Sequence, residues 1–105
     1  MKDGIINLDT SRAKKFGFMS DKYSGWLWKT GDYIIISFIE SKGYLLNLFN
    51  AILRAGYGIK VPTPFARMQR ILELKDFKHI LEEDDKFGVV DIWVKENNKW
   101  TLTYY

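Results

Sequence analysis

The 105-residue sequence contains no cysteine and only two prolines, Pro62 and Pro64. Without cysteine the chain has no disulfide framework, no thiol nucleophile and no cysteine-based zinc or iron–sulfur site. Its uninterrupted apolar runs are short, as at residues 34–36, so we expect no membrane-spanning helix. The N-terminus lacks the apolar stretch of a signal peptide, and the sequence therefore predicts a soluble cytoplasmic protein.

What the sequence does contain is enough apolar material for one folded domain. Hydrophobic residues make up 47% of the chain and charged residues 28%, with a net charge of only +3. This balance excludes a disordered tail and a polybasic nucleic-acid-binding arm. The unusual figure is the aromatic fraction of 16%, from four Trp, six Tyr and seven Phe. These rings belong either to the core or to a binding surface.

The N-terminal segment 1–24 shows the weakest pattern. A short helix is expected over residues 12–16, capped by one of residues 9–11 and ended by Gly17. From residue 25 the signal strengthens, and segments 26–28 and 33–39 predict a β-hairpin around Gly31. The second of these strands is apolar on both faces, so we expect a central strand in a sheet covered on both sides.

The remainder of the chain alternates helical and strand patterns. Thr63 followed by Pro64 predicts a helix start, with threonine as the N-cap. The further predicted elements are a helix over 44–55, a strand over 58–61, a helix from 64 to 75, a strand over 77–81, a charged loop over 82–86, a strand over 89–95, a tight turn at Asn97-Asn98 and a final strand over 99–105. The order β-β-α-β-α-β-β-β predicts a single α/β domain over 1–105, built on a mixed (α+β) sheet with helical crossovers.

The apolar strand ends in a Gly43-containing turn that opens a helix. A second helix ends in ILELKDF, and the strand VVDIWVKE follows it. With these features residues 25–95 resemble the C-terminal half of the GCN5-related N-acetyltransferase (GNAT) fold, in which a similar helix end, LYEKLGF, is frequent. The resemblance implies an abbreviated GNAT-like core over 25–105.

This resemblance also implies acetyl-CoA as cofactor and an N-acetyltransferase activity towards the primary amine of an unknown acceptor. In the family the strand splays from its neighbour and binds the pantetheine, while the turn and the helix N-terminus bind the pyrophosphate. Such a helix end favours anions because its first amides lack intrahelical partners. The cofactor-binding residues implied here are Phe38, Ile39, Ser41, Lys42, Gly43, Tyr44 and Leu45.

No catalytic residue is assigned from the sequence. The family's general acid, a tyrosine in the second helix, corresponds to Leu72, and Glu40 and Asp32 are the carboxylates available as a base. His79, the only histidine, is expected to be structural because no orienting partner is identified, and no metal site is expected. The four carboxylates at 82–85 are expected to form a solvated loop.

The aromatic residues leave alternatives open. Phe38, Phe49, Phe65 and Phe77 are predicted to lie in the core. The pairs Trp26/Trp28 and Trp100/Tyr104 each project from one side of a strand, as expected for packed core, for a subunit interface or for stacking platforms for bases. A non-catalytic GNAT-like module that binds a protein partner or a second copy is therefore the competing hypothesis, and a nucleic-acid-binding module is a third.

Overall fold

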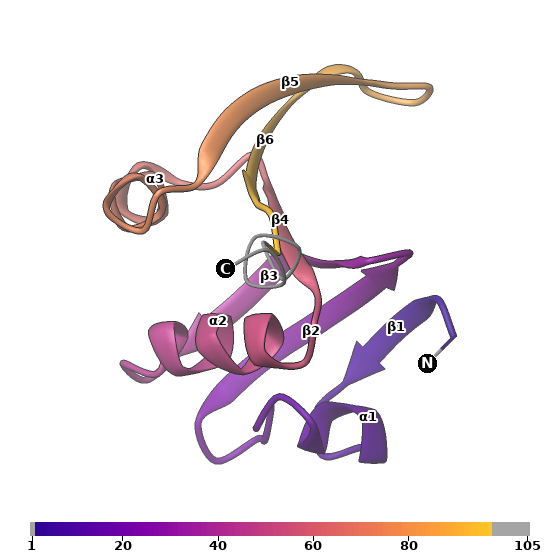
Figure 1. The fold of residues 1–105 in the computed structure, drawn as a ribbon, viewed down its shortest axis with the longest axis vertical. Coiled ribbons are helices and arrows are strands. Elements are labelled where there is room, and N and C mark those ends of the chain that lie inside the picture. The colour runs from indigo at the N-terminus through magenta and orange to yellow at the C-terminus, as the bar shows by residue number, and fades with distance from the viewer. Residues whose placement is uncertain (1, 98–105) are drawn as a thin grey trace, which may run out of the picture.

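The computed structural model describes residues 2–97, and within them the chain forms a mixed α+β fold (Figure 1). It comprises a six-stranded mixed sheet and three helices. The elements are β1 (Gly4–Asn7), α1 (Ser11–Lys14), β2 (Tyr23–Thr30), β3 (Tyr33–Ser41), α2 (Leu45–Arg54), β4 (Gly58–Pro62), α3 (Ala66–Leu74), β5 (Lys78–Asp84) and β6 (Gly88–Lys95). The turn predicted at Asn98 and the strand predicted over 99–105, with Trp100 and Tyr104, lie outside the described residues.

The strands lie in the order β1-β2-β3-β4-β6-β5. Neighbours are antiparallel except β3 and β4, which run parallel. A parallel pair needs a crossover connection, and α2 supplies it. The predicted mixed sheet with a helical crossover is thus confirmed, and so is the β2–β3 hairpin.

The weakly patterned N-terminal segment is part of the same fold. Thr10 caps α1, its hydroxyl accepting a hydrogen bond from the Ala13 amide at 3.2 Å. β1, which the sequence did not predict, pairs with β2 and buries Ile6 completely. The described elements therefore run β-α-β-β-α-β-α-β-β, with a strand and a short helix ahead of the predicted hairpin.

The core lies against one face of the sheet. Apolar residues from that face pack with Ala13 of α1, with Leu48 and Ile52 of α2 and with Leu72 of α3. The opposite face carries exposed side chains, including Trp26, Trp28 and Phe38. Among residues 2–97 the helices cover only one side of the sheet, so the expected covering of both sides is wrong for this part of the chain; we call the helix-bearing side the covered face and the other the uncovered face.

An irregular pairing between β2 and β3 explains why Phe38 was wrongly predicted to lie in the core. Trp26 pairs with Phe38 and Trp28 with Ile35, so one β2 residue lies opposite two residues of β3. Such a bulge shifts the alternation by one position. It turns Phe38 out of the core to the uncovered face, where its side chain is half exposed and its ring stacks on Trp26 at 5.1 Å.

Two other boundaries differ from the sequence pattern. Thr63 has a φ of 39° and its amide bonds the Asp91 carbonyl at 2.7 Å, so it prolongs the β4–β6 ladder instead of capping a helix. The helix begins at Ala66, which leaves Phe65 89% exposed, whereas Phe49 and Phe77 are buried as predicted. β5 continues to Asp84, so the first carboxylates of the expected acidic loop lie in a strand.

Among the helices of residues 2–97, none has the length and apolar character that crossing a bilayer would need.

Gly25 is a position where the fold depends on the absence of a side chain. Its φ is +108°, and a Cβ there would lie 2.3 Å from the Phe38 carbonyl oxygen. We expect Gly25→Ala to lower the free energy of unfolding by about 2–4 kcal/mol, because both the backbone strain and the clash must be relieved. Urea unfolding measures this, and Ser24→Ala, at the exposed neighbouring position, should stay within about 0.5 kcal/mol of the wild type. Equal effects of the two variants would contradict the close approach of β2 and β3.

Candidate functional site

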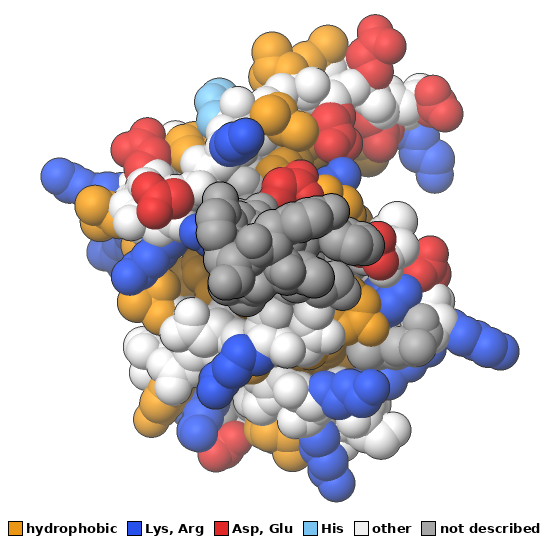
Figure 2. Space-filling view, viewed as in Figure 1, with side chains coloured by type: hydrophobic (Ala, Val, Ile, Leu, Met, Phe, Trp, Pro, Cys, Tyr) orange, Lys and Arg blue, Asp and Glu red, His pale blue; other side chains and the backbone are white. Residues whose placement is uncertain are grey.

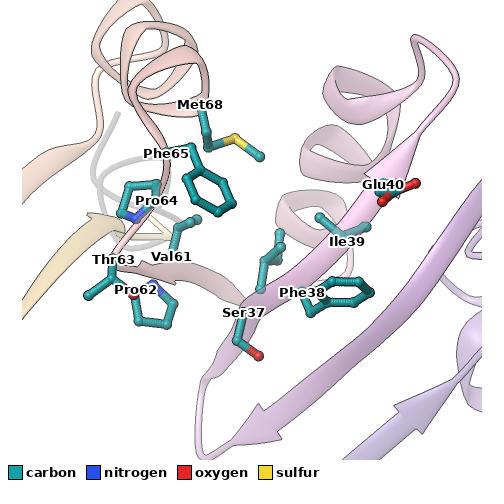
Figure 3. A pocket seen from close by; sticks show the side chains of 11 residues that line it. Ser37, Phe38, Ile39, Glu40, Val61, Pro62, Thr63, Pro64, Phe65 and Met68 are labelled. Atoms are coloured by element: carbon teal, nitrogen blue, oxygen red, sulfur yellow. The ribbon is translucent and has the colours of Figure 1, made fainter. Parts of the chain in front are cut away.

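The parallel strands β3 and β4 pair only at their beginning. Their register runs from Tyr33 opposite Gly58 to Ile35 opposite Lys60, after which both strands continue without pairing to each other. A groove of about 310 Å³, which we call the splay groove, lies beyond this fork (Figure 3). It is lined by Ile36, Ser37, Phe38, Ile39, Glu40, Val61, Pro62, Thr63, Pro64, Phe65 and Met68.

The splay groove contains part of the set of residues expected to bind a cofactor. Phe38 and Ile39 line it, whereas residues 41–45 form the end of β3, the following turn and the start of α2. On the other wall Phe65 faces the groove from the start of α3 (Figure 3). Phe38 and Phe65, both predicted as core, thus form the walls of the groove.

The turn between β3 and α2 leaves backbone amides unpaired. Gly43 has a φ of +85° with open space where a side chain would be. The Lys42 amide donates to the Lys22 carbonyl at 3.1 Å, but within residues 2–97 the amides of Gly43, Tyr44 and Leu45 have no hydrogen-bond partner. The Tyr44 carbonyl accepts a 2.6 Å hydrogen bond from the Tyr23 hydroxyl, which fixes the start of the helix.

A second hollow, of about 280 Å³, lies beside the same helix start and is lined by cations. Lys15, Lys22 and Arg54 line it, and no carboxylate does. The Lys22 ammonium also lies 5.1 Å from the centre of the Tyr44 ring. We call it the basic hollow; with the unpaired amides of α2 it forms an environment that favours a negatively charged group.

A third and larger hollow, of about 700 Å³, lies on the uncovered face beneath the β5–β6 hairpin, which arches away from the rest of the sheet (Figure 1). Figure 2 shows acidic side chains along this hairpin. We call this space the arch hollow. It shares Pro62 and Thr63 with the splay groove. Its lining consists of Thr30, Ile35, Lys60, Pro62, Thr63, Glu82, Glu83, Asp84, Phe87, Val89, Val90 and Ile92.

A set of polar contacts lies at the fork, next to the arch hollow. The Lys60 ammonium bonds Glu82 at 3.1 Å and lies 4.6 Å from the centre of the Tyr33 ring. The Tyr33 hydroxyl donates to the Glu96 carboxylate at 2.5 Å. This hydrogen bond, with a smaller contribution from burial, raises the pKa of Tyr33 from 10.0 to about 12, so the phenol keeps its proton at alkaline pH where an ordinary tyrosine would lose it.

Leu72, Glu40 and Asp32, the residues considered for acid–base roles, lie in three different places. Leu72 is completely buried in the core and does not reach the splay groove. Glu40 lines the groove, whereas Asp32 lies in the β2–β3 turn, where its carbonyl accepts the Gly58 amide at 2.8 Å.

His79 has the orienting partner that the sequence did not identify. Its imidazole contacts the Asp91 carboxylate and stacks on Trp93 with 4.7 Å between the ring centres. The pairing of β5 with β6 brings these residues together across strands, so their separation in the sequence gave no signal. His79 and Asp91 line neither the splay groove nor the two hollows.

Comparison of the chain with protein-family models, with curated proteins and with solved structures finds no match. Within the described part of the chain, no group of three or more His, Asp or Glu side chains is arranged to hold a metal ion.

The Tyr33–Glu96 contact predicts a measurable titration. In Glu96→Gln the charged acceptor is lost, and we expect the pKa of Tyr33 to fall from about 12 towards the ordinary 10.0. The hydrogen bond contributes fully to the free energy of unfolding below pH 10, the ordinary pKa of tyrosine. This contribution is lost as the pH rises towards 12, because the proton is held more tightly in the folded state than in the unfolded state. Ultraviolet absorbance of tyrosinate measures the titration, and Tyr33→Phe identifies its step. A Tyr33 step unchanged in Glu96→Gln would refute the assignment.

Proposed function

We propose that the chain is an abbreviated GNAT-like N-acetyltransferase that binds acetyl-CoA. The observation that carries the proposal is the splay groove, which opens where the parallel pair β3–β4 ends and is lined along β3 as far as Glu40, ahead of the turn whose amides at Gly43 and Tyr44 lack partners within residues 2–97. The GNAT fold that the sequence resembles binds its cofactor in such a fork. The basic hollow beside α2 is a second, independent support.

The chemistry of coenzyme A fits the splay groove, the turn before α2 and the basic hollow, each with a different part of the cofactor. Its pantetheine arm is uncharged and would lie along Phe38, Ile39 and Met68 in the splay groove. Its pyrophosphate would bind the amides of Gly43 and Tyr44, which a helix N-terminus makes favourable for anions. Its remaining phosphate would lie near Lys22 and Arg54 of the basic hollow. Among the described residues that line the splay groove and the basic hollow, Glu40 is the one acidic residue, and in Figure 3 its carboxylate points away from Phe65 and Met68.

Acetyl transfer would take place where the strands diverge. The amine nitrogen of the acceptor attacks the thioester carbon, the new C–N bond forms and the C–S bond breaks. The amine loses a proton, and the departing thiolate gains one. The part of the groove nearest the fork, at Ile36, Ser37 and Pro62, is where this reaction is expected.

Titration with acetyl-CoA tests the proposal. A ligand that binds only the folded state raises the melting temperature, and calorimetry gives its dissociation constant. We expect the double variant Lys22→Gln/Arg54→Gln to weaken binding about 10-fold, because two cations of the basic hollow are lost. Lys86→Gln, which removes a lysine from the β5–β6 turn, is the matched control and should bind as the wild type does. Absence of binding at millimolar acetyl-CoA would exclude the proposed activity.

A second candidate function is that of a non-catalytic module that binds another subunit. It is favoured by the aromatic cluster on the uncovered face, where Trp26, Trp28 and Phe38 are all more than a third exposed and Ile5 extends the same face. Contiguous exposed apolar surface of this kind marks interaction sites.

This second function predicts self-association through the cluster. Sedimentation of the wild type at rising concentration should show dimers, and Trp28→Ser should raise the dissociation constant at least about 10-fold, since aromatic residues dominate such interfaces. Leu74→Ser, which changes an exposed apolar residue at the end of α3, serves as control. A monomeric wild type at the highest concentration would rule out a homodimer.

A further inference from the structure

The strand register decides which side chains of the β5–β6 hairpin face into the arch hollow. Glu82 lies opposite Val90 and bonds Lys60 on the uncovered face of the sheet, so this side of the hairpin faces inward. Ile92 is on the same side, two positions after Val90 and opposite Pro62 of β4. The inner wall of the hollow is therefore apolar, apart from one ion pair that crosses it.

The other acidic residues of the hairpin contribute no free charge to this inner wall. Glu83 and Val89 lie opposite each other and one position further along their strands, so both point to the other side of the hairpin. Asp84 is held in the turn, where its carboxylate accepts two backbone amides at 2.8 and 3.1 Å. Among the described lining residues, the charges on the inner wall are thus those of Lys60 and Glu82, and they cancel.

The Lys60–Glu82 pair is accessible and keeps hydrogen-bonding capacity. Its charged atoms lie 3.1 Å apart, and the two side chains are 25% and 42% exposed. The Lys60 ammonium has three N–H groups, and the second carboxylate oxygen of Glu82 accepts no hydrogen bond within residues 2–97. A donor and an acceptor therefore lie side by side. An amide matches both with its carbonyl and its N–H, whereas any ion is repelled by one of the two.

The surroundings of the pair favour an uncharged, apolar molecule. Ile35 and Pro62 line the hollow from the sheet, Val90 and Ile92 line it from the hairpin, and Phe87 in the hairpin turn is 78% exposed. Covering this surface is favourable for an apolar group and costly for an ion, which gives up its hydration. The volume of about 700 Å³ is that of a cavity for a small organic molecule.

We infer that the arch hollow binds a small uncharged molecule with an apolar body and an amide group, the amide held by Lys60 and Glu82 and the body covered by the hairpin. This is a second ligand site, which shares only Pro62 and Thr63 with the splay groove and no residue with the basic hollow. It does not depend on acetyl transfer, so a failure of acetyl-CoA to bind leaves it intact.

Three probes with the same phenylpropyl skeleton and different end groups test the requirement for a neutral amide. We expect hydrocinnamamide to bind at least about 5-fold more tightly than hydrocinnamate or phenylpropylamine, because each ion makes one repulsive contact with the pair. Calorimetry on the protein without cofactor measures the three affinities. Equal affinities, or tighter binding of either ion, would overturn the inference.

Methyl-resolved NMR spectra place the ligand on one side of the hairpin. Hydrocinnamamide should shift the methyl groups of Ile35, Val90 and Ile92, which line the hollow. The methyl groups of Leu81, which lies next to Glu82 and on the opposite side of β5, should not shift. Shifts at Leu81 without shifts at Val90 and Ile92 would show that the probe binds elsewhere.

Removing one charge of the pair should reverse the selectivity. In Glu82→Gln the Lys60 ammonium loses its partner, so hydrocinnamate should become the preferred probe. In Lys60→Gln, by the same argument, phenylpropylamine should be preferred. Glu83→Gln, on the outer side of the same hairpin, is the matched control and should keep the preference for the amide. Circular dichroism verifies that each variant is folded, and a wild-type order of affinities in folded Glu82→Gln would refute the role of the pair.

Discussion

The parallel pairing of β3 with β4, and its early end at Ile35 and Lys60, is the constraint on which the candidate site depends. β3 stays paired with β2 up to Ser41, so its backbone remains extended while its β4 side opens. Beyond Thr63, β4 gives way to α3, which prevents the two strands from meeting again. The fork thus produces the splay groove on its open side and sets the floor of the arch hollow at its closed end.

Charged residues of opposite sign are unevenly distributed around this fork, which the small net charge of the chain does not indicate. A chain of net charge +3 has a hollow whose charged lining residues are lysine and arginine beside α2, and a larger hollow beneath the β5–β6 hairpin whose charged lining residues are three acidic residues and Lys60. The covered face, by contrast, is occupied by apolar side chains. Charge therefore distinguishes the two sides of the candidate site, and a polar molecule approaching the sheet would meet a different potential at each.

Much of the framework could be predicted from the sequence because it depends on local signals. Gly31 marked the turn of the β2–β3 hairpin, and the apolar periodicity located α2. Phe38 and Phe65 were misplaced because a bulge and a positive φ at Thr63, neither visible in a hydrophobic pattern, turned both rings towards solvent. In the candidate site, Phe38 and Ile39 were expected on the grounds of resemblance, whereas the arch hollow was not foreseen.

The sequence by itself determined the class of fold, the hairpin, the two longer helices and the absence of cysteine chemistry, since each follows from residue type and near-neighbour spacing. Only the tertiary structure decided which face of the sheet the helices cover, where β3 and β4 separate and which carboxylates face a hollow. Pairs such as Lys60 with Glu82 and His79 with Asp91 are distant in the chain and meet only through strand register. Register is set by the packing of the whole sheet, and for that reason the candidate site became visible only in three dimensions.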